Sequence, residues 1–283
     1  MATFTNQATL SYNNTVLNSN VATGEIVEVL TAEKTAVSTD YRNGEDVTYV
    51  ISLANSGTAP LTGITVTDDL GAYTVGAQTV YPLEYKDGTA KVYVNGALQG
   101  DATVTGVQPL TFDNITVPAG GNVLIVLEAN VTQFAPLGTG SVITNTATAT
   151  GAGITAPVAA AATLPVSPEP ELAITKSISP STVTENSRVT YTFTIQNFGN
   201  TEAVADGNAV VTDTFNPTLS DLDVRFNGTP WAETTNYTYD EATGLFSTVP
   251  GEITVPAATY VQNPDGTFTT TPGTAVLTVT GTI

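Results

Sequence analysis

The chain has 283 residues and a formal net charge of −19, with 41% hydrophobic and only 12% charged residues. Such an acidic chain offers no basic patch to displace counterions, so we expect no nucleic acid partner. It contains no Cys and no His, which excludes thiol chemistry, Ser-His catalysis and ordinary zinc sites, and we predict neither a metal nor a cofactor. No run of residues is long and apolar enough to span a bilayer.

Residues 1–14 have neither the basic start nor the apolar run of a Sec signal peptide. If the protein is extracellular, we therefore expect export by another route, such as release by lysis of a sporulating mother cell, or a leader that precedes this sequence. Residues 4–27 keep the alternation of β-strands, which disordered tails seldom do.

The chain after residue 27 contains one strand-rich module twice. VTYVISLANSG at 47–57 matches VTYTFTIQNFG at 189–199. Further blocks match in the same order: 64–70 with 210–215, 92–98 with 224–230, 115–120 with 253–258, and 121–131 with 273–283. The blocks alternate or are β-branched, Gly, Pro, Asn or Asp clusters separate them, and helical periodicity is absent. We predict an all-β protein of two tandem Ig-like β-sandwich modules, the second with an extra hairpin near 260–270.

The two modules differ at their ends. The first continues past Val131 into residues 143–166, which read as a hairpin of two closing strands, whereas the second ends at Ile283, the position equivalent to Val131. Residues 4–27 align with 143–166 without a gap. The closing hairpin that the second module lacks is therefore expected at the front of the chain.

A sandwich without its last strands exposes unpaired backbone groups and an apolar groove, and a donor strand repairs both. The donor could come from the same chain or from a neighbour. The short Pro-rich linker favours the neighbour, because the closing hairpin then leads directly into the following module everywhere in an open filament. The predicted segments are donor strands at 1–27 (with Phe4, Asn6, Ala8 and Leu10 facing inward), a module at 28–166, the linker at 167–171 and an incomplete module at 172–283. The alternative is a disordered tail and a merely truncated C-terminus.

Three kinds of polar residue share the parity of core residues within the predicted strands. They are the lysines Lys34 and Lys176, the aspartates Asp68 and Asp213, and the asparagines Asn145 and Asn6. Burial lowers the pKa of a lysine and raises that of an aspartate. A neutral amine is a nucleophile and a protonated Asp polarises an amide, so such a trio can form a Lys–Asn amide and release ammonia. The alternative for each trio is a satisfied buried salt bridge without a reaction.

The Lys, VTD and NTAT elements resemble those of the bacterial "conserved repeat" surface domains of unknown function. The Lys, Asp and Asn that share the parity of core residues resemble the residues of the self-generated isopeptide bonds in Gram-positive pilins and collagen-binding-type adhesin domains. This resemblance covers essentially both modules and implies that Asp68 and Asp213 assist while Lys and Asn join. Carried across, it joins Lys34 to Asn145 within a chain and Lys176 to Asn6 of another subunit. Asp69 adjoins Asp68, so the choice of carboxylate rests on phase alone.

The function hypothesis is a structural subunit of an extracellular homopolymeric fibre, pilus-like or a spore- or cell-surface appendage, whose partner is itself, head to tail. The alternative is an adhesin or carbohydrate-binding fragment of a larger bacterial surface protein, with Trp231 and the tyrosines available for sugar stacking and the host or surface ligand left open. Trp231 fits a core or edge aromatic equally well. We expect no enzyme beyond autocatalytic isopeptide formation, since the carboxylates are scattered over turns.

Overall fold

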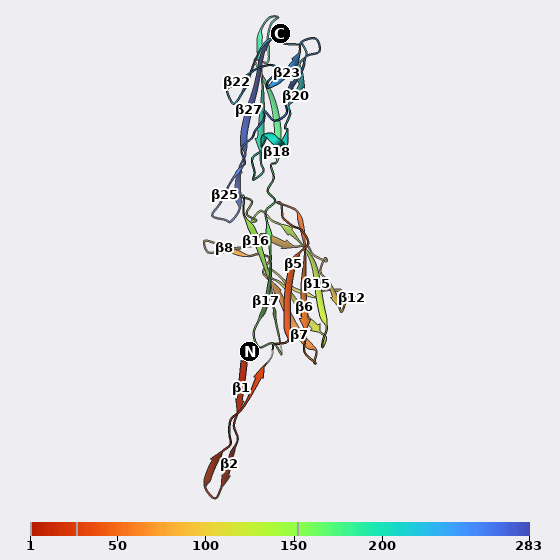
Figure 1. Ribbon diagram of the computed structural model, residues 1–283, viewed down its shortest axis with the longest axis vertical. Helices are drawn as coiled ribbons and strands as arrows, with labels where there is room; N and C mark the ends of the chain where they lie inside the picture. Colours follow the sequence, from red (N-terminus) through yellow and green to blue (C-terminus); the bar gives the residue numbers. More distant parts are fainter. Residues whose placement is uncertain (1, 27, 152) are drawn as a thin grey trace. The chain divides into compact units, whose positions relative to one another are not determined.

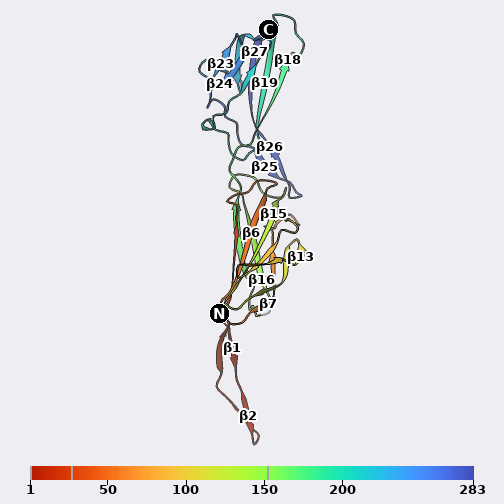
Figure 2. The same ribbon diagram turned by 90° about the vertical axis from the view of Figure 1, so that its right-hand side faces the viewer.

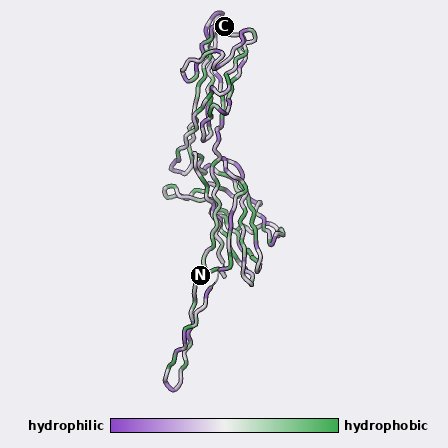
Figure 3. The backbone as a smooth tube through the Cα atoms, viewed as in Figure 1, coloured by the Kyte–Doolittle hydropathy of each residue, from purple (hydrophilic) through white to green (hydrophobic). Residues whose placement is uncertain are grey.

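The computed structural model describes residues 2–26, 28–151 and 153–283. The described chain is built of β-strands apart from one 3₁₀ turn at Ala205–Gly207. It divides into two compact units, unit 1 with Met1–Ala135 and Val142–Pro165, and unit 2 with Pro136–Ser141 and Val166–Ile283. Figures 1 and 2 show each unit as layers of strands, and Figure 3 shows apolar and polar residues interspersed along those strands. The prediction of an all-β protein with two Ig-like β-sandwich modules is confirmed.

Unit 1 is a sandwich of two sheets with the core between them. One sheet has the order β12-β11-β15-β6-β5, with β10 also pairing with β15. Its strands are β5 (Leu30–Ala36), β6 (Asp46–Asn55), β10 (Leu83–Tyr85), β11 (Lys91–Val94), β12 (Ala97–Asp101) and β15 (Asn122–Val131). In β6 and β15 every second side chain is buried, as alternating apolar residues require.

The other sheet of unit 1 has the order β13-β14-β7-β16-β17. Its strands are β7 (Leu61–Asp68), β13 (Val104–Val107), β14 (Leu110–Val117), β16 (Val142–Thr150) and β17 (Val158–Pro165). The predicted closing hairpin is confirmed, because β16 pairs with β17 from Val142↔Pro165 to Ala149↔Val158. β16 also pairs with β7, placing Ala147 opposite Asp68, and β17 lies against β5 of the other sheet. A separate short hairpin consists of β8 (Tyr73–Val75) and β9 (Gln78–Val80).

Unit 2 repeats the five-strand path of the first of these sheets, without a counterpart of β10 among its described residues, in the order β22-β21-β27-β19-β18. Its strands are β18 (Leu172–Ser179), β19 (Arg188–Asn197), β21 (Ser220–Phe226), β22 (Thr229–Trp231) and β27 (Gly273–Thr282). The repeat extends to single side chains. Asn55 and Asn197 end equivalent strands, and each accepts a 2.9 Å hydrogen bond from the backbone N–H of the glycine two residues on.

The second sheet of unit 2 holds three strands in the order β23-β24-β20. They are β20 (Thr212–Thr214), β23 (Tyr237–Asp240) and β24 (Leu245–Thr248). The extra hairpin predicted near residues 260–270 is confirmed as β25 (Thr259–Gln262) and β26 (Phe268–Thr271), with its turn at Asn263 to Gly266. The segment Pro136–Ser141, between β15 and β16, groups with unit 2, where the hydroxyl of Thr139 donates to the carbonyl of Asn200.

Residues 2–26 form a hairpin that we call the N-terminal arm (red in Figure 1). Its strands are β1 (Ala2–Asn6), β2 (Thr9–Tyr12), β3 (Thr15–Asn18) and β4 (Ala22–Ile26), with β1 pairing with β4 and β2 with β3. The described side chains from Phe4 to Glu25 are exposed, except at the half-buried Gly24. A two-stranded hairpin without a core is only marginally stable in water. The arm also carries apolar residues that remain exposed in the free chain.

Candidate functional site

Lys34 and Asp68 meet inside unit 1, between the two sheets. Lys34 lies on β5 of one sheet and Asp68 ends β7 of the other, and their Nζ and Oδ2 atoms are 2.6 Å apart. Both side chains have no exposed surface. Lys34 shares the inward face of β5 with Leu30, as its parity predicted. The strand pattern therefore places a charged amine in the core and supplies one carboxylate to face it.

Burial opposes charge on both members of this pair. Loss of hydration lowers the pKa of Lys34 below its ordinary value, although Asp68 partly offsets the effect. Burial likewise raises the pKa of Asp68, against the opposing effects of Lys34 and of the backbone N–H of Leu70. Both shifts favour the pair in which the amine is neutral and the carboxyl is protonated. This is the state in which a lysine nitrogen has a free lone pair and an aspartic acid can donate a proton.

Asn145 completes the site from β16 and is completely buried. It lies two residues before Ala147, the residue opposite Asp68, and so on the same face of the sheet. Neither its side-chain nitrogen nor its oxygen has a hydrogen-bond partner. An unsatisfied buried amide costs about 1–3 kcal/mol, so this asparagine needs an explanation other than stability.

Tyr49 lies near both Lys34 and Asn145. Its ring centroid lies 5.1 Å from Nζ of Lys34. The Tyr49 hydroxyl lies near enough to Asn145 for the amide to influence the pKa of Tyr49, although the two groups do not form a hydrogen bond. Sequence reasoning missed Tyr49. The signal was present, since VTY in the first repeat block matches VTY in the second and so pairs Tyr49 with Tyr191.

Asp69 has a different task from its neighbour. Its Oδ1 accepts hydrogen bonds from the backbone N–H groups of Gly71 and Thr146, at 2.9 and 2.8 Å. It therefore holds the turn after β7 against β16. The structure places Asp68, and not Asp69, beside the lysine.

Unit 2 holds the equivalent pair in an open setting. Lys176 on β18 and Asp213 on β20 form an ion pair, but their side chains are 40% and 18% exposed. The Lys176 amine also lies 4.6 Å from the ring centroid of Tyr191 and 5.4 Å from that of Phe215. The lysine thus points toward the core side of its sheet, as its parity predicted, although that side is only partly covered.

The described residues of unit 2 lack two strands that cover the equivalent lysine in unit 1. In unit 1, β7 pairs with β14 on one edge and with β16 on the other. Within the described residues of unit 2, its counterpart β20 pairs with β24 alone, so its second edge is free. Every residue of β18 is exposed, including Leu172, Ile174 and Ile178. The places that β16 and β17 fill in unit 1 are vacant here, and the position of Asn145 has no counterpart.

An apolar groove marks the vacancy. It has a volume of about 160 Å³ and is lined by Leu172, Ala173, Ile174, Ile195, Ala209, Val210, Val211 and Ile253. A soluble protein seldom leaves such a groove beside an unpaired strand edge, because both invite association.

The predicted donor residues Phe4, Asn6, Ala8 and Leu10 are all exposed on the N-terminal arm. Asn6 stands opposite Ala22 in the arm, as Asn145 stands opposite Ala162 in the closing hairpin. The pairing slips by one residue from the gapless alignment, which would oppose Asn6 to Thr23 and Phe4 to Glu25. The slip puts Gly24 under the Phe4 ring and keeps the Glu25 carboxylate out of that row.

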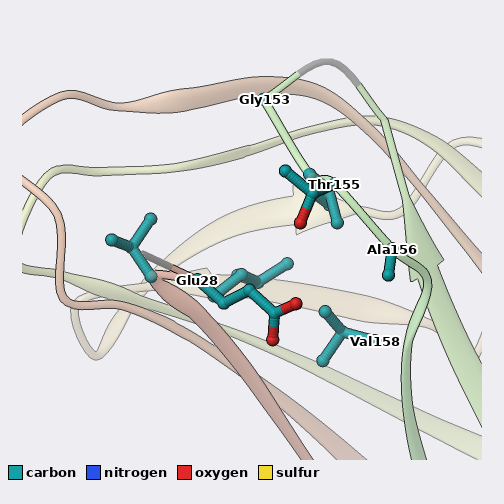
Figure 4. Close-up of a pocket in the computed structure, with 8 residues that line it drawn as sticks. Glu28, Gly153, Thr155, Ala156 and Val158 are labelled. Carbon is teal, nitrogen blue, oxygen red and sulfur yellow. The ribbon is translucent and has the colours of Figure 1, made fainter. Parts of the chain in front are cut away.

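Other features of the described chain bear on a carbohydrate, small-molecule, metal or membrane site. Trp231 lies on the edge strand β22 with its ring stacked on Phe226, at 4.9 Å between centroids. A small pocket at one end of unit 1, with Glu28, Thr155 and Val158 among its lining residues (Figure 4), has a volume of about 20 Å³, room for roughly one water molecule.

No cluster of three acidic residues in the described part of the chain could hold a metal ion. None of its helices has the length and apolar character needed to cross a membrane.

No family model and no curated protein matches the sequence. Among solved structures, the chain is similar to the major pilin subunit BcpA of Bacillus cereus, with 15% identity and a TM-score of 0.36 over 96% of this chain and 73% of that one. The pilus backbone RrgB of Streptococcus pneumoniae is 13% identical, with a TM-score of 0.32 over 90% and 50% of the two chains. The collagen adhesin of Staphylococcus aureus is 14% identical, with a TM-score of 0.32 over 55% of each. With all TM-scores below 0.5, the function has to be argued from the residues.

Proposed function

We propose that this chain is the structural subunit of an extracellular homopolymeric fibre, carried on a cell or spore surface. The N-terminal arm of one subunit inserts into unit 2 of the next and supplies the two strands that unit 2 lacks. An isopeptide bond between Lys34 and Asn145 locks unit 1, and a bond between Lys176 and Asn6 of the neighbouring subunit locks the joint.

The free edge of β20 beside the uncovered β18 is the observation that carries this proposal. Unpaired backbone groups and a groove lined by Leu172, Ile174 and Val211 together fit one kind of occupant, an apolar β-hairpin. The arm is such a hairpin, and its sequence matches the one that closes unit 1. Head-to-tail contacts of this kind do not close on themselves and so make filaments.

Unit 1 serves as a template for the register of the inserted strand. Ala147 pairs with Asp68 and Thr148 with Thr67. Transferred through the repeat, Ala8 pairs with Asp213, Thr9 with Thr212 and Leu10 with Val211 in the neighbouring unit 2. Asn6, two residues before Ala8, then faces the core beside Lys176, in the position that Asn145 has in unit 1.

The chemistry requires no group from outside the trio. The neutral Nζ of the lysine attacks Cγ of the asparagine, and an Nζ–Cγ bond forms while the Cγ–Nδ2 bond breaks. The aspartic acid protonates the departing nitrogen and recovers a proton from Nζ, so that one ammonia leaves and the carboxyl ends unchanged. Each chain performs this reaction once per bond, so the protein is not a turnover enzyme.

A boiled denaturing gel tests the covalent joint. Wild type should give a ladder, and Asn6→Ala and Lys176→Ala should each abolish it, whereas Asn145→Ala is the matched control that keeps the ladder and alters unit 1 alone. If both joint variants still give a ladder, the Lys176–Asn6 bond is not what links the subunits.

Disulfide trapping tests strand insertion separately, because the natural chain has no cysteine. Thr9→Cys combined with Thr212→Cys, in an Asn6→Ala background, should give a reducible ladder, since residues opposite each other on paired strands lie within disulfide range. The matched control, Thr9→Cys with Thr214→Cys, is two residues out of register and should give far less. A reducible cross-link confined to monomers would mean that the arm closes its own chain.

A further inference from the structure

The described chain contains only three buried side-chain polar atoms without a hydrogen-bond partner, and all three lie at one place. They are the hydroxyl of Tyr49 and the amide nitrogen and oxygen of Asn145. Buried polar groups are nearly always paired. Three orphan atoms together, beside the Lys34–Asp68 pair, indicate an arrangement kept for a reaction and not for stability.

The Tyr49 hydroxyl is suited to donate one hydrogen bond here. Burial, and secondarily the nearby Asp68 charge, hold the pKa of Tyr49 above its ordinary value, so the phenol keeps its proton at physiological pH. Asp68 is engaged by Lys34 and by the backbone N–H of Leu70. This leaves the amide of Asn145 as the group that the phenol can serve.

We propose that the Tyr49 hydroxyl, and that of Tyr191 in unit 2, donates a hydrogen bond to the carbonyl oxygen of the attacked asparagine and stabilises the negative charge that forms there. The inference rests on the proposed function, since it assigns a second group to the same bond-forming step. Attack by the lysine nitrogen turns the planar amide into a tetrahedral centre with charge on Oδ1. A donor that reaches Oδ1 as this charge develops stabilises the tetrahedral state more than the neutral amide. The phenol transfers no proton, so the balance of the reaction is unchanged.

The repeat supports extension to unit 2. Tyr191 occupies the position of Tyr49 in the matching block, and each ring lies close to its lysine, at 4.6 Å from Lys176 and 5.1 Å from Lys34. Tyr191 also packs on Phe215, with 4.8 Å between ring centroids. Removal of the hydroxyl alone, as in Tyr191→Phe, leaves this ring packing in place.

Unit 2 makes the step measurable, because its two reactants lie on different chains. A full-length donor carrying Lys176→Ala is mixed with a full-length acceptor carrying Asn6→Ala, and covalent dimer is followed on denaturing gels at increasing acceptor concentration. Adding Tyr191→Phe to the acceptor should lower the maximal rate on the order of 100-fold, as loss of one oxyanion donor does, while half-saturation stays the same. Tyr260→Phe is the matched control, since Tyr260 is half-buried like Tyr191 but its hydroxyl donates to the backbone carbonyl of Phe198.

The outcomes separate this inference from the proposed function. An unchanged maximal rate for Tyr191→Phe, or a change in half-saturation alone, overturns the role of the hydroxyl and leaves the fibre proposal standing. Absence of covalent dimer from the unsubstituted donor and acceptor overturns the covalent joint and this inference with it. In unit 1, mass spectrometry of freshly made Tyr49→Phe should show a fraction of chains that still retain the ammonia of Asn145, and complete loss at the wild-type rate counts against the proposal.

Discussion

Lys34 and Lys176 occupy the same position of the same strand in two copies of one module, yet one is sealed and the other is 40% exposed. The sheets that carry them have the same strand order, and each lysine faces an aspartate and a tyrosine. What differs is the pair of strands β16 and β17, which unit 1 has and unit 2 lacks among its described residues. The presence of this hairpin therefore determines whether the lysine is buried, since the sheet, the aspartate and the tyrosine beside the lysine are the same in both units.

This difference gives a physical reason why Lys176 would react only after assembly. An ion pair that water reaches is screened and stabilises little, so an unfilled unit 2 imposes neither the desolvation nor the asparagine that the reaction needs. In the proposed fibre, insertion of the arm supplies both at once. The chemistry of the joint would then be tied to correct assembly, and a free subunit would not react.

The most direct way to break the comparison is to complete unit 2 within its own chain. Residues 1–27 are removed from the front and attached after Ile283 through a copy of the 132–142 segment. We expect a chain that no longer polymerises, because its groove is filled in cis, and that loses two ammonia molecules where the monomeric wild type loses one. Size-exclusion chromatography and intact mass check both results.

The control for this rearrangement carries Asn6→Ala in the relocated arm. It should stay monomeric and lose a single ammonia. Persistent filaments from the rearranged chain would show that the groove on unit 2 is not the assembly surface.

A second prediction concerns the lock on unit 1. Asn145→Ala removes the proposed cross-link to Lys34, which would span about a hundred residues, and chain entropy alone makes such a link stabilising by about 4–5 kcal/mol. The free energy of unfolding of unit 1, from denaturant titration, should fall by about that amount. Asn6→Ala, its counterpart in the arm, should leave the unfolding of unit 1 unchanged, and equal effects of the two substitutions would contradict the assignment.

Much of this difference was readable from the sequence. The repeat blocks predicted the strands, and period-two parity placed Lys34, Asp68 and Asn145 on inward faces, where the structure buries all three. Parity could not tell that Lys176 would remain partly exposed, because burial depends on strands elsewhere in the chain. It also could not show the one-residue slip in the arm, since a gapless alignment carries no information on cross-strand pairing.

The third prediction uses a matched pair of leucines. Leu30 and Leu172 begin equivalent strands, but Leu30 is buried and Leu172 is 44% exposed. Leu30→Ala should cost unit 1 about 2–5 kcal/mol, whereas Leu172→Ala in a chain that lacks residues 1–27, and so has no arm to insert, should cost unit 2 less than about 1 kcal/mol. In the cis-completed chain the cost of Leu172→Ala should rise toward that of Leu30→Ala, and no rise would mean that the arm does not cover β18.

The last prediction concerns pH and the buried carboxyl of Asp68. In a Lys34→Met, Asn145→Ala chain, Asp68 stays buried without its amine, and the bond between residues 34 and 145 cannot form. Burial raises the pKa of Asp68 in the folded state above its ordinary value of 3.8. The folded protein then holds a proton that the unfolded chain releases, so the free energy of unfolding is highest below pH 3.8 and falls by roughly 1.4 kcal/mol for each pH step of one until the folded pKa is reached. Denaturant titrations of unit 1 from pH 4 to 7 should show this decline, and adding Asp68→Asn should remove it. A slope that survives Asp68→Asn would trace to other titrating groups and would contradict its assignment to Asp68.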